Sequence, residues 1–140
     1  MRVLACLILC LVLAVPADAN EPLTRALNGL RAAEGRAPVA YSKTLAQVAQ
    51  AHAQDMARQG RMSHIGSDGS KIGQRVRRAG YRWCHVSENV AKGHRSLQKV
   101  LNAWAASPGH RRNMVNRKAR EFGLGRVGDE YWVMVLAGPG

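Results

Sequence analysis

The sequence predicts an α+β fold in which helices gather around a small, mostly antiparallel sheet. Three segments carry apolar residues at i, i+3 and i+4, which is typical of helices with one buried face. A fourth segment alternates apolar and polar residues like a half-buried strand, and the C-terminal region has the pattern of a hairpin. The helices are expected between residues 20 and 35, 42 and 60, and 96 and 107, and the strands at 86–91, 121–127 and 131–137.

The first nineteen residues predict a secretory signal peptide. Arg2 precedes the uncharged apolar run 3–15, and residues 17–19 form a small-x-small cleavage pattern. The run is too short to span a bilayer, so we expect no transmembrane anchor after cleavage. Residues 20–140 then form a single domain, exported to a periplasm or out of the cell.

The cysteines indicate a fold without disulfides. Cys6 and Cys10 leave with the signal peptide, so Cys84 is the only thiol of the mature chain. Its neighbour His85 would point to the opposite side of a strand, which argues against a nucleophilic Cys/His pair. We therefore expect Cys84 to be a buried structural residue and the domain to be stabilised by its core.

The charge is strongly positive. After residue 19 the chain has 20 Lys and Arg against 8 Asp and Glu, a balance that attracts anionic lipids or envelope polymers. The alternative is a solvated basic surface that maintains solubility. Specific nucleic-acid binding is not expected, because no aromatic residues interleave with the basic cluster, whose arginines are expected to face solvent: Arg75, Arg77, Arg78 and Arg82.

The first two helices each have a clear inward stripe. The first ends at Gly35, and the second begins at Ser42 or Thr44 and ends at Gly60. His52 lies on the second stripe, which favours a hydrogen-bonded packing residue over a ligand. The stripes consist of Leu23, Ala26, Leu27 and Leu30, and of Leu45, Val48, Ala49, His52 and Met56.

The middle of the chain contains a short basic helix and the first expected strand. Ser70 is expected to cap the helix at 71–79, after a turn at 66–70. In the strand, Glu88 stands between Val86 and Val90 on one face. A carboxylate at such a position must be paired or bound, because burying it bare is costly.

The helix that ends before Pro108 leads directly to a histidine. Its stripe comprises Leu97, Val100, Leu101 and Trp104. Residues 107–109 are expected to end it, so that His110 lies at the mouth of a turn beside the core, and a short helical turn after His110 is expected to run through Met114 and Val115. In the hairpin that follows, with a two-residue loop at 128–129, the last strand is apolar on both faces and is expected to lie between helices.

Three polar residues stand where the pattern would place apolar residues or loops: His64, Glu88 and His110. Two imidazoles and a carboxylate are a reasonable set for a divalent metal such as zinc, copper or nickel. They lie 24 and 22 residues apart with no local ligand pair, so the pattern alone leaves open that His64 is an ordinary surface histidine.

Successive motifs along the mature chain resemble those of bacterial CAP-domain proteins, the superfamily of cysteine-rich secretory proteins, antigen 5 and plant pathogenesis-related proteins. The motifs are Asn28-x-x-Arg31, Leu45-x-x-Val48-Ala49-x-x-His52, Met62-Ser63-His64, Ser87-Glu88-Asn89-Val90-Ala91, Trp104-x-x-Ser107-Pro108-Gly109-His110-Arg111-x-Asn113 and Phe122-Gly123-Leu124-Gly125. They occur in order and cover essentially the whole mature chain.

The resemblance implies a three-layer α-β-α sandwich whose central cleft holds two histidines and two acids, often around zinc or another divalent ion. His64, Glu88 and His110 fall on matching positions. The second acid does not transfer, because its position is Ser107 here. Glu121 is the substitute candidate; the alternative is an exposed carboxylate that offsets Arg120.

Three functions remain open. In the favoured one, a monomer holds a metal through His64, His110 and Glu88, the last directly or through water, with Glu121 as a further candidate. It also binds a small-molecule, lipid or envelope ligand. The second is a metal-dependent peptidase or esterase with Glu88 or Glu121 as general base. No Gly-x-Ser-x-Gly or His-Glu-x-x-His motif supports it. The third is a surface binder of anionic polymers or membranes.

Overall fold

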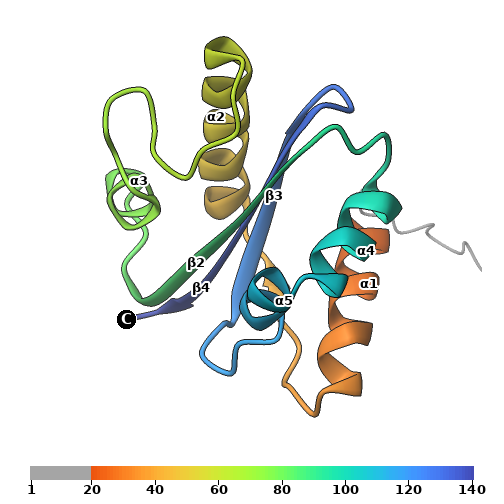
Figure 1. Ribbon diagram of the computed structural model, residues 1–140. Coiled ribbons are helices and arrows are strands. Elements are labelled where there is room, and N and C mark those ends of the chain that lie inside the picture. The colour runs from red at the N-terminus through yellow and green to blue at the C-terminus, as the bar shows by residue number, and fades with distance from the viewer. Residues whose placement is uncertain (1–19) are drawn as a thin grey trace, which may run out of the picture.

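The computed structural model describes residues 20–140, so the predicted signal peptide lies outside the described residues. In this part of the chain, helices pack around one four-stranded sheet with strand order β1-β3-β4-β2 (Figure 1). The elements are α1 (Glu21–Ala33), β1 (Ala40–Tyr41), α2 (Lys43–Gln59), α3 (Ile72–Arg78), β2 (Trp83–Lys92), α4 (Leu97–Ala106), α5 (Pro108–Met114), β3 (Glu121–Val127) and β4 (Tyr131–Pro139).

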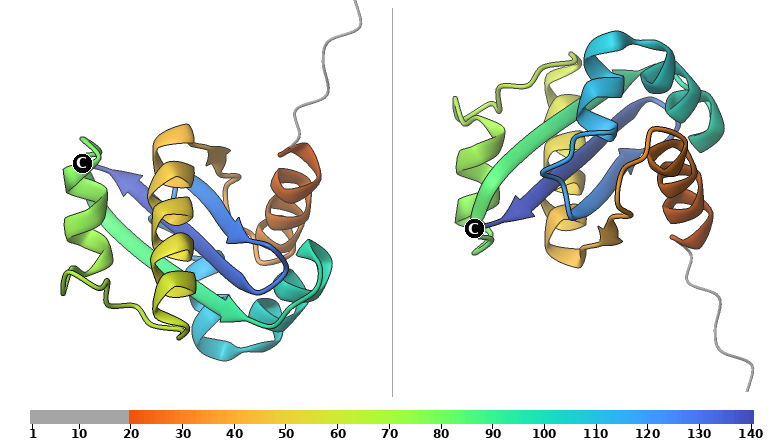
Figure 2. Two further views of the ribbon diagram at one scale, coloured as in Figure 1. Left: turned by 90° about the horizontal axis from the view of Figure 1, so that it is seen from above. Right: turned by 90° about the horizontal axis from the view of Figure 1, so that it is seen from below.

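The helices form two layers on opposite faces of the sheet, which confirms the α-β-α sandwich. Helices α2 and α3 lie on one face, and α1, α4 and α5 lie on the other (Figures 1 and 2). The sheet is antiparallel except for the short parallel pair β1–β3, a strand that the sequence pattern did not indicate. Within residues 20–140, no helix has both the length and the apolar character needed to cross a bilayer.

Strand β4 runs through the centre of the sheet and is buried from Tyr131 to Gly138, as its two apolar faces predict. Beside it, β3 allows α2 to pack directly on the sheet. A Cβ atom on Gly123 would lie 2.1 Å from the backbone nitrogen of Ala46, and one on Gly125 would lie 2.2 Å from that of Gln50. These two glycines therefore set the distance between α2 and the sheet.

Several predicted boundaries are confirmed, and others differ. Ser42 caps α2 through its hydroxyl, and Gly60 ends that helix in the left-handed conformation. The cap of α3 is Lys71 rather than Ser70. The β3–β4 loop has three residues, 128–130, rather than two, because Val127 pairs with Tyr131.

Two side chains lie differently from what their sequence positions suggest. Arg31, on the inward face of α1, is fully buried and donates to the carbonyl oxygens of Ala37, Met114, Asn116 and Ala119, so it ties α1 to the segment after α5. Cys84 was expected to be buried but is exposed and free. It lies at the beginning of β2, where an irregularity in the pairing with β4 interrupts the alternation.

Candidate functional site

Glu88 is the centre of the site. It lies in β2 between Val86 and Val90, and all three side chains face α2 and α3, as the alternation predicts. Only 5% of Glu88 is exposed. Its Oε1 accepts a hydrogen bond from His64 Nδ1 at 2.8 Å, and its Oε2 accepts one from an Arg75 guanidinium nitrogen at 2.7 Å. The expectation that this carboxylate must be paired is therefore confirmed.

Arg75 is the residue that sequence reasoning missed. It was expected to face solvent, but its side chain is only 12% exposed and forms an ion pair with Glu88. It also donates to the carbonyl oxygens of His64 and Ser70, which ties the loop before α3 to the same carboxylate. A signal was present in the sequence, because Arg75 follows Ile72 by three and precedes the buried Val76 by one, on the inward side of α3.

His64 lies in the loop between α2 and α3, with its Nδ1 on Glu88 and 58% of its side chain exposed. The hydrogen bond to Glu88 raises the pKa of His64 above its ordinary value, and partial burial opposes this effect. Because Nδ1 carries the proton shared with Glu88, the lone pair of the neutral ring is on Nε2. Nε2 is therefore the atom that His64 can offer to a ligand.

His110 lies in the first turn of α5, which begins at Pro108, whereas the helical turn was expected to begin after His110. Its Nδ1 is hydrogen-bonded to the hydroxyl of Ser107 at 2.9 Å. Burial lowers the pKa of His110, and the positive charge of protonated His64 lowers it further. The neutral ring is thus favoured, and its Nε2 offers a lone pair to a ligand in the tautomer whose Nδ1–H donates to the Ser107 hydroxyl.

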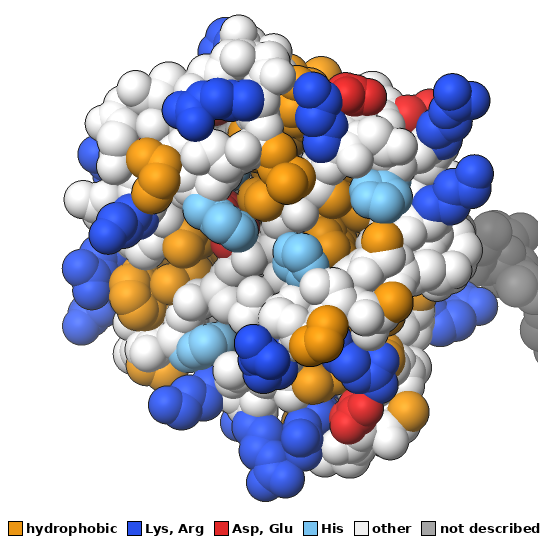
Figure 3. Space-filling view, in the orientation of Figure 1, with side chains coloured by type: hydrophobic (Ala, Val, Ile, Leu, Met, Phe, Trp, Pro, Cys, Tyr) orange, Lys and Arg blue, Asp and Glu red, His pale blue; other side chains and the backbone are white. Residues whose placement is uncertain are grey.

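The two histidines approach the same part of β2 from opposite sides of the sheet. Strand β2 is an edge strand, and His64 reaches Glu88 from the α2–α3 side. On the other side, the Asn89 amide donates to the carbonyl oxygen of His110 at 3.1 Å. The Asn113 amide donates to the carbonyl oxygen of Glu88 at 3.3 Å, so α5 is docked at the Glu88–Asn89 step. Figure 3 shows several histidine side chains on this face of the molecule. His64, Glu88 and His110 are called the histidine site below.

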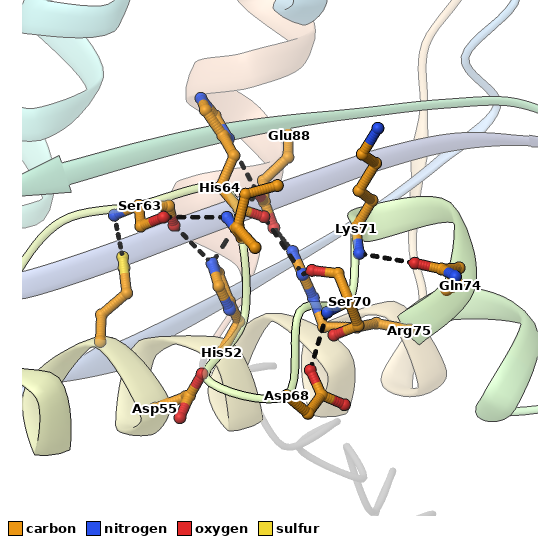
Figure 4. A network of polar contacts seen from close by, with 12 residues as sticks. His52, Asp55, Ser63, His64, Asp68, Ser70, Lys71, Gln74, Arg75 and Glu88 are labelled. Atoms are coloured by element: carbon orange, nitrogen blue, oxygen red, sulfur yellow. Dashed lines mark hydrogen bonds and ion pairs between the residues drawn. The ribbon is translucent and has the colours of Figure 1, made fainter.

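His52, on α2, is the third residue that approaches the Glu88 carboxylate. It is 2% exposed, hydrogen-bonded through Nε2 to the carbonyl oxygen of Ser63 at 2.7 Å, and 4.0 Å from Glu88 Oε1. Its packing role is confirmed. Figure 4 shows how His52 from α2, His64 from the loop and Arg75 from α3 converge on Glu88.

Glu121 has a different partner. It begins β3 and accepts a hydrogen bond from the hydroxyl of Tyr81, which follows α3. Burial is the main cause that raises the pKa of Tyr81 well above its usual range, and the hydrogen bond to Glu121 raises it further. The structure thus joins Glu121 to Tyr81, and no contact connects it with His64, Glu88 or His110 among the described interactions.

The donor chemistry limits how a metal could fit. Within residues 20–140, no three His, Cys, Asp or Glu side chains are arranged so that they could hold a metal ion by themselves. Both oxygens of Glu88 already accept hydrogen bonds, one from an arginine, so Glu88 is poorly suited to direct coordination. The two Nε2 atoms suit zinc or a similar ion, provided that an incoming ligand completes the coordination.

Comparison with known proteins identifies the family. The model of the cysteine-rich secretory protein family, CAP, matches residues 24–136. This chain belongs to the CAP family. Its sequence is 30% identical over 100 residues to the uncharacterized protein YkwD of Bacillus subtilis, a match that covers 71% of this chain and 39% of YkwD. The chain thus spans well under half the length of that relative.

Solved structures show the same fold. An extracellular SCP-domain protein from Bacillus anthracis superposes with a TM-score of 0.79 at 24% identity, over 84% of this chain and 39% of that protein. An outer surface protein from Borrelia burgdorferi gives a TM-score of 0.78 at 22% identity, over 86% of this chain and 92% of that protein. In this chain the buried partner of Glu88 is Arg75.

Proposed function

We propose that this CAP domain is exported and uses its histidine site to bind a divalent cation, with zinc as the first candidate, together with an anionic ligand. The observation that carries the proposal is that each imidazole has its Nδ1 engaged by a side chain, Glu88 for His64 and Ser107 for His110. Protein ligands of metals are commonly oriented in this way, with the other ring nitrogen left for the metal.

In this proposal Nε2 of His64 and Nε2 of His110 hold the ion, which supplies a positive charge that an anionic ligand can bind. Glu88 does not coordinate it but fixes the ring of His64 and favours the Nδ1–H tautomer. Arg75 neutralises Glu88 and holds it in place. Asn89 and Asn113 dock His110 beside the same step of β2.

The surroundings of His64 support a ligand with an apolar part. Met62 and Ile65, on either side of His64, are the exposed large apolar residues of the described chain. An amphipathic ligand, such as a lipid with an acidic headgroup, would place its acid at the cation and its apolar part against these side chains. The chain's net charge of +12 also favours an anionic partner.

Export is supported by similarity and by the N-terminal pattern. Two matched structures are described as an extracellular protein and an outer surface protein. The first nineteen residues have the pattern of a signal peptide. The site contains no nucleophile–base–oxyanion arrangement beyond the Ser107–His110 hydrogen bond, so binding is preferred to hydrolysis as the function.

Thermal unfolding with zinc tests the proposal. Zinc should raise the melting temperature of the wild type by several degrees at saturation, since a ligand that binds only the native state stabilises it. His64→Ala combined with His110→Ala should abolish the shift. His94→Ala is the matched control, because it removes a histidine outside the site. Equal zinc shifts in all three proteins would reject the histidine site as the place of binding.

A further inference from the structure

Basic side chains without an acidic partner gather where β2 begins and the chain ends. Two come from α3 and the turn after it, and three come from the segment between α5 and β3. All are exposed, and none forms an ion pair with a carboxylate of residues 20–140. This cluster is called the basic end of the sheet and consists of Arg77, Arg82, Arg117, Lys118 and Arg120.

The last residues of the chain bring the two groups of charges together. The backbone nitrogen of Gly140 donates to the carbonyl oxygen of Arg82 at 3.3 Å. A Cβ atom on Gly138 would lie 2.2 Å from the carbonyl oxygen of Lys118. Two residues of extended chain span about 7 Å, so both groups of charges lie at one end of the sheet. Figure 1 shows the C-terminus beside the beginning of β2.

A hollow of about 360 Å³ lies within the basic end of the sheet. Its lining residues are Arg77, Gly80, Tyr81, Arg82 and Trp83. The guanidinium group of Arg77 lies over the ring of Trp83, 4.7 Å from its centroid, which holds this cation at the surface. The hollow therefore offers two arginines, neither of which is neutralised by a carboxylate of the described chain.

The carboxylates of the described chain leave the basic end of the sheet without an ion-pair partner. Seven of the eight Asp and Glu side chains of residues 20–140 pair with basic residues outside the cluster. The eighth, Glu121, accepts a hydrogen bond from the hydroxyl of Tyr81. Like charges that share a surface repel one another, and an anionic partner would relieve this repulsion.

The aromatic residues of the cluster do not provide a stacking surface for nucleic-acid bases. Trp83 is covered by Arg77 and donates to the carbonyl oxygen of Gly73 at 3.2 Å. Tyr81 is partly buried and is held by its hydrogen bond to Glu121. Proteins that bind single-stranded nucleic acids combine cations with aromatic rings on which bases stack. The basic end of the sheet has the cations alone.

The cluster also has no apolar side chain suited to insertion into a membrane. Met62 and Ile65, the exposed large apolar residues of the described chain, lie in the loop between α2 and α3. That loop begins beside the other end of β2, because Lys92 donates to the carbonyl oxygen of Gly60. Surface binding to a bilayer combines cations with buried apolar side chains. Charge without such side chains favours a polymer over a membrane.

We propose that the basic end of the sheet binds a linear polymer that carries repeated phosphate groups. Four of the five cations are arginines, whose planar guanidinium group can hold a phosphate through two parallel hydrogen bonds. One phosphate would lie in the hollow between Arg77 and Arg82, and the next ones would lie against the remaining cations. This surface uses no residue of the histidine site, so it does not depend on a metal there.

Fluorescence anisotropy with labelled long-chain inorganic polyphosphate tests the proposal. The wild type should bind with a dissociation constant of about 10 μM or tighter at about 0.1 M salt. The affinity should fall steeply as the salt concentration rises, because counterions released from the polymer drive binding. Orthophosphate and polyglutamate, the single-phosphate and carboxylate probes, should compete about tenfold more weakly at equal charge concentration.

Two double variants with the same loss of charge provide the matched comparison. Arg82→Gln with Lys118→Gln should weaken polyphosphate binding by about tenfold and lower the slope of the salt dependence by about two. Both side chains are exposed, so the melting temperature should stay that of the wild type. Arg61 and Arg95 are also exposed, but they lie near the other end of β2, at Lys92. Arg61→Gln with Arg95→Gln should therefore bind within about twofold of the wild type, because salt screens distant charges.

Three results would overturn the proposal. The first is that the wild type does not bind polyphosphate. The second is that both double variants lose the same affinity, which would show that only the net charge matters. The third is that polyglutamate, single-stranded DNA or vesicles of phosphatidylglycerol bind more tightly than polyphosphate at equal charge concentration.

Discussion

The two imidazoles of the histidine site are held in contrasting ways. His64 is fixed by a buried carboxylate that also binds an arginine from another helix, so its position depends on α2, α3 and β2 together. His110 is fixed by a hydroxyl only three residues earlier in the chain. The comparison teaches that the ring of His64 is oriented by tertiary contacts, whereas the ring of His110 is oriented within a single turn and only its backbone is docked to β2, through Asn89.

The largest expected difference between the two halves of the site is in the free energy of unfolding that is lost when the partner of each histidine is removed. Glu88→Ala leaves the guanidinium of Arg75 buried without its partner and should lower the free energy of unfolding by about 3–5 kcal/mol. Ser107→Ala removes one partly exposed hydrogen bond and should cost about 1 kcal/mol or less. Urea unfolding of both variants measures these losses of unfolding free energy. Equal losses would contradict the contrast between the two halves.

The next difference is in how much zinc affinity each variant loses when the residue that orients one of the two histidines is changed. Glu88→Gln keeps the shape of the side chain but weakens the hold on His64, and should reduce zinc affinity about 10-fold to 100-fold. Ser107→Ala should reduce it less, because the backbone of His110 stays anchored to Asn89. Calorimetric titration with zinc provides the affinities. A greater loss for Ser107→Ala would reverse the assignment of the better-oriented ligand.

The pKa values of the two histidines should lie on opposite sides of the ordinary value of 6.5. Glu88 raises the pKa of His64, whereas burial and the charge of His64 lower that of His110. In Glu88→Gln the pKa of His64 should fall. Titration of the ring protons by NMR separates the two sites, and coincident titration curves would show that Glu88 does not act on His64.

The smallest effect is the pH dependence of stability. The raised pKa of His64 contributes stability that is fully present below 6.5 and is lost as the pH rises through the folded-state value. His110 has the opposite sign: its contribution is present above 6.5 and is lost as the pH falls through its lowered value. The wild type should therefore exceed His64→Ala in unfolding free energy by more at about pH 5.5 than at about pH 8.5. A gap that does not change with pH would argue against this coupling.

Much of the fold could be predicted from the sequence because its signals are local. The stripes of α1, α2 and α4, the alternation around Glu88 and the doubly apolar β4 each reflect a periodicity that burial imposes. The parallel strand β1 could not be predicted, because a two-residue strand has no periodicity. The exposure of Cys84 also escaped prediction, since it depends on a local irregularity in β2.

The site was predictable in part for the same reason. The position of Glu88 on an apolar strand face required a buried partner, and the motifs selected His64 and His110. Arg75 was hidden in a basic helix whose other arginines are largely exposed, and only the spacing to Ile72 and Val76 distinguishes it. The partner of Glu121, Tyr81, lies forty residues away, beyond the reach of any local pattern.

The central claim is that Nε2 of His64 and Nε2 of His110 share one metal ion. A crystal structure of the zinc-soaked protein, with anomalous data collected at the zinc absorption edge, tests it most directly. The account predicts a single zinc peak about 2.0–2.1 Å from both Nε2 atoms, with Glu88 still bound to His64 and Arg75. A zinc ion bound elsewhere, or held by only one of the two histidines, would contradict it.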